Sequence, residues 1–257
     1  MKLNEIIKII EKEYPPELAY EWDNSGLFFG DLQKEISCVL VTLDVTPEII
    51  NEAIENKAEL ILSHHPVLMD GVKTLSDNSM QSEMLLSLVK NDIAVYSAHT
   101  NMDTAAFGIN QKLAELFELC DIVVMENDKP YPDCGLGRVG NLKTKMRLFD
   151  FCEVVKEKLN TPFVRVSGED REINRVAFAS GSCGEYIPSA IKKGAKVIVT
   201  ADIKYHHAIE YVHDGIAIID AGHYPTEIIV MDMFNDLLKD LDVKVIYSKN
   251  QDIFKVR

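Results

Sequence analysis

One stretch of the chain occurs twice, and this limits the folds that the chain can adopt. Residues 39–65 align without a gap with residues 176–202. Most of the shared positions are apolar, so a common strand–helix–strand pattern explains them about as well as a true repeat does. Both explanations place the same βαβ unit in each half of the chain. Seven of the 27 aligned pairs are identical, those of Val39, Glu48, Ile50, Ala53, Ile54, Ala58 and Ile61.

A second alignment strengthens the case for a repeat. Shifted by 124 positions, residues 94–103 place His99 on His223 and Asp103 on Glu227. Each half therefore ends a predicted strand with a histidine, followed four positions later by an acidic residue at the start of a helix.

The hydrophobic pattern alternates between strand and helix along the chain. This alternation is typical of an α/β fold with a largely parallel sheet. Short apolar runs predict strands at 36–43, 59–63, 94–98, 163–167, 173–180, 196–200, 216–220 and 243–248. Helical spacing predicts helices before Pro15, after Thr46, and at 80–91, 108–119, 147–159, 186–193 and 226–239.

We therefore predict an α/β protein built from two similar units. The segment 126–137 is rich in Pro, Gly and Asp and is the expected linker between them. The first α/β repeat is then residues 1–125 and the second is residues 138–257. The hexapeptide GLGRVG (135–140) fits G-x-G-x-x-G, but it lacks the preceding strand and following helix that dinucleotide binding requires.

Composition and charge exclude several classes of protein. Hydrophobic residues make up 47% and charged residues 26%, as in an average soluble domain, and no apolar run approaches the ~20 residues of a membrane span. We therefore expect no membrane partner. A net charge of −14 makes direct nucleic acid binding unfavourable. The five cysteines are odd in number and contain no C-x-x-C pair, which fits the reducing cytoplasm.

Histidines follow three of the predicted strands. His64 and His65 come directly after strand 59–63, and His99 and His223 follow later strands. Open α/β sheets bind their ligands at the carboxyl ends of the strands. A single histidine there is usually a loop or packing residue, but three strand ends with histidine indicate a site.

Imidazole and carboxylate groups together suit Zn, Fe, Mn or Ni. In an extended chain the rings of His64 and His65 point apart, so two neighbouring ions take them more easily than one ion does. Asp103 and Glu227 can bridge two ions. With His223 these residues make five protein ligands for a two-metal centre whose remaining positions are open to water.

Six short segments together resemble the signature blocks of the Nif-three-like dinuclear metal centre family, whose members are also called GTP cyclohydrolase I type 2 homologues. The resemblance runs from about residue 5 to the last strand, in a short form without the middle domain that many members insert between the halves. The segments are DNSGLFFG (23–30), TLDVT (42–46), SHHP (63–66), HTNMD (99–103), TADIKYHH (200–207) and GHYPTE (222–227).

The resemblance implies two similar α/β units related by a pseudo-dyad, with the metal site in the cleft between them. It also implies ring-shaped homohexamers. The family's metal ligands correspond to His64, His65, Asp103, His223 and Glu227, the same five residues that the strand ends suggest.

Further residues are candidates for roles beside the metals. His99 is expected to act as a general acid or base, or to orient Asp103 by a hydrogen bond. Lys204 and His206 lie in a signature block and are candidates for binding an anionic substrate. The glycine-containing segment 180–186 either offers backbone N–H groups to an anion or is a plain tight turn, which we favour.

These observations predict a metal-dependent hydrolase with two divalent transition metal ions, Zn, Fe or Mn. The ions activate water for attack on a cyclic amide, a heterocycle or a phosphoester, and a small anionic or nucleotide-like substrate is expected. The alternative is a non-catalytic protein that needs metal for binding, metal delivery or ring assembly. Exchangeable water ligands and a substrate-sized pocket favour the enzyme.

Overall fold

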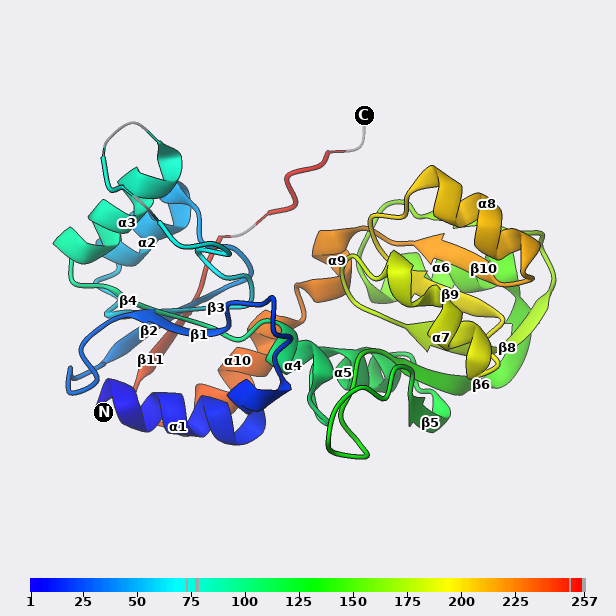
Figure 1. The fold of residues 1–257 in the computed structure, drawn as a ribbon, viewed down its shortest axis with the longest axis horizontal. Helices are drawn as coiled ribbons and strands as arrows, with labels where there is room; N and C mark the ends of the chain where they lie inside the picture. Colours follow the sequence, from blue (N-terminus) through cyan, green and yellow to red (C-terminus); the bar gives the residue numbers. More distant parts are fainter. Residues whose placement is uncertain (73, 77–78, 250, 256–257) are drawn as a thin grey trace. The chain divides into compact units, whose positions relative to one another are not determined.

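The computed structural model describes residues 1–72, 74–76, 79–249 and 251–255. The chain forms two compact units (Figure 1). The first unit contains residues 1–102 and 230–251, and the second contains residues 103–229 and 252–257. No helix of the described residues combines the length and the apolar character that a membrane crossing needs.

The first unit is built on a five-stranded sheet in the order β1-β4-β3-β2-β11, in which only β1 is antiparallel to its neighbour. Helices α2 and α3 pack on one face, and α1 and α10 lie on the other (Figure 1). The strands are β1 (Gly26–Phe29), β2 (Cys38–Thr42), β3 (Leu60–Ser63), β4 (Ala94–Ser97) and β11 (Lys244–Tyr247). The helices are α1 (Leu3–Glu13), α2 (Pro47–Glu55), α3 (Met80–Lys90) and α10 (Val230–Leu238).

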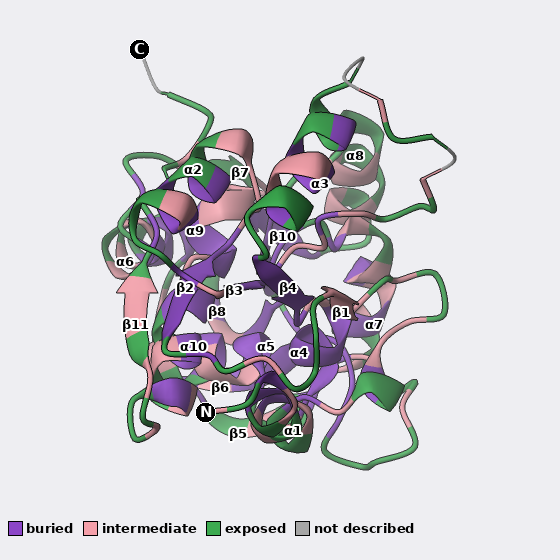
Figure 2. Ribbon diagram, turned by 90° about the vertical axis from the view of Figure 1, so that its left-hand side faces the viewer, coloured by how far each residue is buried: buried purple, intermediate pink, exposed green. Residues whose placement is uncertain are grey.

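Local sequence explains where these elements begin and what they cover. The Thr46 side chain accepts a hydrogen bond from the backbone N–H of Ile49, and Pro47 occupies the first helical position of α2. Ser79 caps α3 in the same way. Every residue of β2, β3 and β4 is buried, because helices cover both faces of this parallel region (Figure 2).

The second unit is built on a six-stranded sheet in the order β5-β6-β8-β9-β10-β7. Helices α5 and α6 pack on one face, and α7 and α8 pack on the other. The strands are β5 (Cys120–Val124), β6 (Arg138–Arg147), β7 (Arg165–Ser167), β8 (Glu172–Phe178), β9 (Val197–Thr200) and β10 (Ala217–Asp220). The helices are α5 (Ile109–Leu116), α6 (Leu148–Lys158), α7 (Ile187–Lys192), α8 (Tyr205–His213) and α9 (His223–Glu227).

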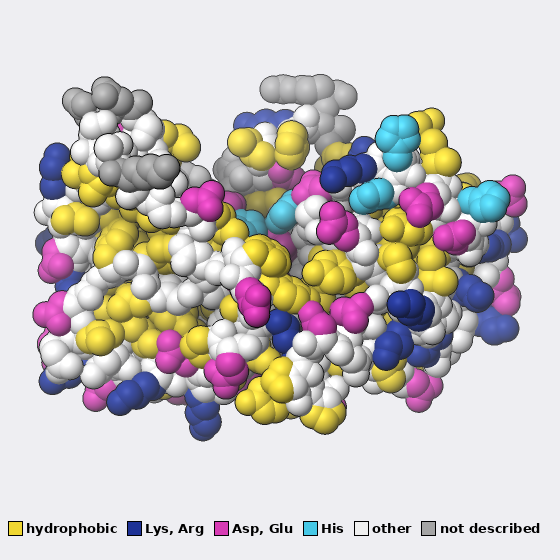
Figure 3. Space-filling view, viewed as in Figure 1, with side chains coloured by type: hydrophobic (Ala, Val, Ile, Leu, Met, Phe, Trp, Pro, Cys, Tyr) yellow, Lys and Arg dark blue, Asp and Glu magenta, His cyan; other side chains and the backbone are white. Residues whose placement is uncertain are grey.

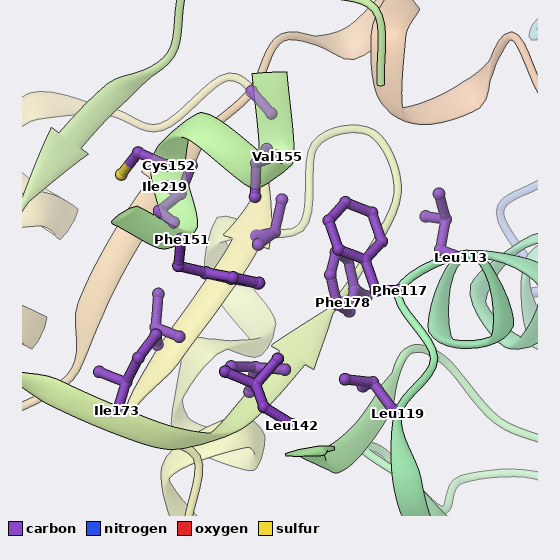
Figure 4. Close-up of a cluster of buried hydrophobic side chains, with 14 of the residues drawn as sticks. Leu113, Phe117, Leu119, Leu142, Phe151, Cys152, Val155, Ile173, Phe178 and Ile219 are labelled. Carbon is purple, nitrogen blue, oxygen red and sulfur yellow. The ribbon is translucent and has the colours of Figure 1, made fainter. Parts of the chain in front are cut away.

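Three aromatic rings form the centre of the core between the sheet and α5 and α6 (Figure 4). The ring centroid of Phe117 lies 4.4 Å from that of Phe178 and 6.0 Å from that of Phe151. Burial of such rings is the largest favourable contribution that single side chains make to a core. This core holds β8, β9 and β10 in place, and these strands lead to the candidate site of the second unit.

The topology confirms that the chain contains two similar α/β units. The parallel strands β4-β3-β2 of the first sheet have the same order as β10-β9-β8 of the second. An antiparallel strand flanks each set, β1 beside β4 and β7 beside β10. A short helix follows the last parallel strand in both units, α4 (Thr100–Thr104) in one case and α9 in the other. The relation of the units by a pseudo-dyad stays a prediction.

The compact units do not coincide with the stretches 1–125 and 138–257. The C-terminal strand β11 belongs to the first unit, because its backbone pairs in parallel with β2 at the end of that sheet. The predicted helix at 226–239 is two helices, α9 and α10, although its apolar pattern runs through the break. The strands β1, β5 and β6 and the helix α8 were not predicted from the sequence.

The segment 126–137 is part of the second unit and is anchored there by Arg138. This side chain is almost completely buried and donates hydrogen bonds to the Gly135 and Gly137 carbonyl oxygens at 2.8 and 2.9 Å. It donates further bonds to the carbonyl oxygens of Ala105, Ala106 and Asp133 and to the side chain of Gln111. Burial lowers the pKa of Arg138, but the group remains a cation at neutral pH.

We expect Arg138→Met to lower the free energy of unfolding by about 3–5 kcal/mol, because the buried carbonyl oxygens lose the charged donor that binds them. The measurement is urea denaturation followed by circular dichroism, with metal removed by a chelator so that ligand binding does not contribute. Arg147→Met is the control, because Arg147 forms an exposed ion pair with Asp170 and should change stability little. Equal effects of both substitutions would contradict this account.

Candidate metal centre

Three histidines meet at the carboxyl ends of β3 and β4 in the first unit. His64 and His65 follow β3, and His99 follows β4. One ring nitrogen from each lies within 4.8 Å of those of the other two. The ring centroids of His64 and His65 are 5.1 Å apart, and His99 lies 5.3 and 5.6 Å from them. The parallel strands end at the same edge of the sheet, and this brings His99 next to residues that precede it by 34 and 35 positions.

The expectation that the rings of His64 and His65 point apart is wrong. The chain bends at both residues, so the alternation of side chains along β3 ends at Ser63. The hydroxyl groups of Ser63 and Ser97 donate to the carbonyl oxygen of His65 at 2.9 and 3.3 Å and hold the bend. The geometry therefore allows one ion to bind both rings. The expectation of two ions then rests on the family resemblance and not on the directions of these rings.

Each of the three rings is oriented by an oxygen at its Nδ1 atom. His64 bonds to the carbonyl oxygen of Ala98 at 2.8 Å, and His65 bonds to Asp44 at 2.7 Å. His99 bonds to Asp23 at 2.7 Å. An Nδ1 atom that faces such an oxygen carries the hydrogen, and the metal-binding lone pair is then on Nε2. The three Nδ1 contacts therefore select the tautomer that metal binding needs.

Asp23 has a fully buried side chain and is saturated with hydrogen bonds. Burial alone would raise the pKa of Asp23, but the hydrogen bond and charge of His99 and the hydroxyls of Ser25 and Thr100 outweigh it. The pKa of Asp23 therefore lies well below its ordinary value, and the group is a carboxylate at neutral pH. It can hold the His99 ring whether the ring is neutral or protonated.

In the second unit, His223 and Glu227 form a pair on one face of α9. The residues are four positions apart in a helix, which places them on the same side, and His223 Nε2 lies 2.9 Å from a Glu227 carboxylate oxygen. The His223 Nδ1 atom lies 2.7 Å from Asp202. A neutral imidazole has one N–H group, so a ring between two carboxylates needs a further proton or a positive charge at Nε2, which a metal ion would supply.

Asp103, on α4, lies in the same part of the second unit as Glu227. Both carboxylates lie close enough to the buried thiol of Cys183 for their charges to act on it. Burial, and then the charges of Asp103 and Glu227, raise the pKa of Cys183 well above its usual range, so the thiol is neutral. Cys183 is therefore a small buried residue beside two candidate metal ligands.

The segment 180–186 shapes this site through Gly181. The residue has φ +61°, and a β-carbon there would overlap the Glu227 carboxylate and lie 3.2 Å from His223 Nε2. The backbone N–H groups of Gly181 and Cys183 donate to the hydroxyls of Thr226 and Thr200. These donors already have protein acceptors, which favours the plain turn over an anion-binding loop.

Lys204 and His206 are exposed residues at the beginning of α8. Three of the seven histidines lie on this helix, and histidine side chains are visible on the surface in its region (Figure 3). The His206 ring packs edge-on against Tyr205, with centroids 5.9 Å apart. A role of Lys204 and His206 in substrate binding stays a prediction.

The structure thus assembles the predicted ligands in two groups. His64 and His65 are together in the first unit, and Asp103, His223 and Glu227 are together in the second. Sequence reasoning assigned no role to Asp23 and Asp44, which orient histidines, or to Gly181, which leaves room for Glu227. The sequence pointed to Asp23 and Asp44 only through their places in the segments DNSGLFFG and TLDVT, and to Gly181 through the glycine-containing segment 180–186.

Comparison with known proteins identifies the family. The sequence profile of Duf34/NIF3 (NGG1p interacting factor 3) matches residues 1–253. The chain belongs to the Duf34/NIF3 family. A relative from Clostridium perfringens, named GTP cyclohydrolase 1 type 2 homolog, is 38% identical over 97% of each chain.

Several solved structures have the same fold. The NIF3-related protein of Bacillus cereus matches with a TM-score of 0.91 and 26% identity, and the match covers 100% of this chain and 99% of that one. Reduced HcgD from Methanocaldococcus jannaschii matches with a TM-score of 0.84 and 33% identity over 97% of this chain and 98% of its own. These matches confirm the family that the sequence segments resemble and the α/β fold class.

We expect Gly181→Ala to weaken binding of divalent metal about 10- to 100-fold, because the new methyl group displaces the Glu227 carboxylate. The measurement is competitive titration of the metal-free protein with Zn²⁺ and a chromophoric chelator. Gly215→Ala is the matched control: Gly215 also has positive φ, +85°, but apart from its chain neighbours no described residue lies within 4 Å of a β-carbon there. If both variants bind metal equally well, Gly181 does not position Glu227.

Proposed function

We propose that this Duf34/NIF3 protein is a metal-dependent hydrolase whose centre holds two divalent transition metal ions, Zn, Fe or Mn. The proposed ligands are His64, His65, Asp103, His223 and Glu227. The observation that carries the proposal is the hydrogen bond that each ring Nδ1 atom makes to an oxygen. In both units an oxygen bonds to Nδ1 of the candidate ligand histidines, so the metal-binding lone pair is on Nε2, which in His223 faces the Glu227 carboxylate.

The donor set fits the proposed ions. Neutral imidazole nitrogens with carboxylate oxygens favour Zn, Fe or Mn over Mg or Ca, which prefer all-oxygen sites. His64, Asp103 and Glu227 are buried, and a divalent cation is a favourable neighbour for carboxylate oxygens and an imidazole nitrogen that are removed from water. The Asp44–His65 and Asp202–His223 contacts match the carboxylate–histidine–metal arrangement of known metal sites.

When bound, divalent ions act as Lewis acids and lower the pKa of a coordinated water to near neutrality. The contribution of the protein is then proton transfer and orientation. His99 is anchored through Nδ1 to Asp23, so its Nε2 atom keeps a fixed direction and can take up or release a proton. The buried Asp23 carboxylate holds the ring in this orientation while a proton is transferred at Nε2.

The proposed substrate is a small anionic or nucleotide-like molecule with a cyclic amide, a heterocycle or a phosphoester to hydrolyse. Relatives are named GTP cyclohydrolase 1 type 2 homolog, and that name agrees with ring hydrolysis. We further propose a homohexamer ring in the cytoplasm. Light scattering of the purified protein tests the assembly.

Elemental analysis of the tag-free protein tests the centre. We expect about two ions of Zn, Fe or Mn per chain, and a marked loss of metal in His223→Ala. His213→Ala is the matched control, because His213 is an exposed histidine at the end of α8 and should leave the metal content unchanged. Protein that contains no metal, and takes up none on titration, would contradict the proposal.

His99→Ala separates proton transfer from metal binding. If His99 is the proton relay, the variant keeps its metal and loses about 10²- to 10⁴-fold in turnover. Hydrolysis of bis(p-nitrophenyl) phosphate and of dihydrouracil are suitable assays, one for phosphoesters and one for cyclic amides. Unchanged turnover would exclude the relay, and loss of metal would make His99 a metal ligand.

A further inference from the structure

Trp22 is the single tryptophan of the chain, and 60% of its surface is exposed. It precedes Asp23, the carboxylate that anchors His99. Single exposed apolar side chains are common on protein surfaces, and Phe107 and Tyr205 are more exposed than Trp22. What distinguishes Trp22 is that its ring lies beside the His99 ring of the histidine group.

The ring of Trp22 is held in a defined orientation. The Tyr20 ring stacks on it with an interplanar angle of 10° and centroids 5.7 Å apart. The His99 ring meets it edge-on at 79°, with centroids 6.3 Å apart. The backbone on both sides is fixed as well, since Thr100 accepts from the Tyr20 N–H and bonds to Asp23.

We propose that Trp22 is a stacking platform for a ligand with a flat heteroaromatic ring, which binds beside the His64–His65–His99 group. Tyr20 stacks on one face of the indole, and the ligand ring takes the other face. A ring stacked there lies next to His99, so the atom to be hydrolysed is brought to the proposed centre. This inference rests on the proposed function and adds the chemical class of the substrate.

The chemistry of the platform favours a flat conjugated ring over a sugar, a lipid or a peptide. Parallel stacking uses the whole face of an indole, whatever the substituents of the ligand ring, and it already occurs here between Tyr20 and Trp22. Because Trp22 is oriented before the ligand binds, little conformational entropy is lost on binding.

The single tryptophan makes the test direct. The metal-loaded protein is titrated with AMP, CMP and ribose 5-phosphate, and tryptophan fluorescence is excited where nucleotides do not absorb. We expect saturable quenching by the nucleotides and none by ribose 5-phosphate, which has the same phosphate but no flat ring. Equal responses to all three probes, or no quenching by either nucleotide, would overturn the proposal.

Variants establish the role of the ring by a second measurement. In equilibrium dialysis we expect Trp22→Leu to bind AMP about 5- to 150-fold more weakly, with Trp22→Phe in between. Phe149→Leu is the matched control, because Phe149 is an exposed aromatic residue of α6 in the other unit. If Trp22→Leu only lowers thermal stability and binds AMP as the control does, Trp22 merely covers Asp23.

The metal content of each variant separates the two proposals. We expect Trp22→Leu to keep its metal, since Trp22 offers no metal-binding atom. If the wild-type protein has no metal but shows ring-dependent quenching, the hydrolase proposal fails and the platform stands. If metal is bound but no flat ring is, the platform fails and the metal centre stands.

Discussion

The parallel pairing of the central strands determines where each unit can carry out chemistry. In the first sheet the pairing places Thr42 opposite Ser63, and Ser63 opposite Ser97, so β2, β3 and β4 end at one edge. In the second sheet Thr200 lies opposite Asp220. The loops that follow these strands therefore begin side by side, and the histidines and acidic residues that they carry meet although they are far apart in sequence.

The two units use equivalent positions for different tasks. Under the 137-residue shift, His65 corresponds to Asp202 and Asp44 corresponds to Gly181. In the first unit His65 is a candidate ligand, and Asp44 orients its ring. In the second unit Asp202, at the position of His65, orients His223. Gly181, at the position of Asp44, leaves space for the Glu227 carboxylate. One repeated backbone thus presents two different sets of donor atoms.

Buried charges stiffen the segments that have no regular structure. The carboxylate of Asp23 and the guanidinium of Arg138 both lie out of water, and each is surrounded by hydrogen-bond partners. A buried charge is tolerated only when its hydrogen bonds are satisfied, so the chain around it cannot move independently. In the first unit this rigidity extends to Trp22 and His99, the two residues to which we assign ligand stacking and proton transfer.

Local patterns in the sequence determined most of the parallel strands, several helices and the identity of the candidate ligands, because periodicity and strand ends are properties of neighbouring residues. The strand β6 was missed because its second half is polar and forms only where β8 provides a partner. The helix predicted at 226–239 is divided between two units. Only the tertiary structure supplied Asp44 for His65 and Asp23 for His99, from 21 and 76 positions away. Ring orientation depends on these long-range hydrogen bonds, which no local pattern records.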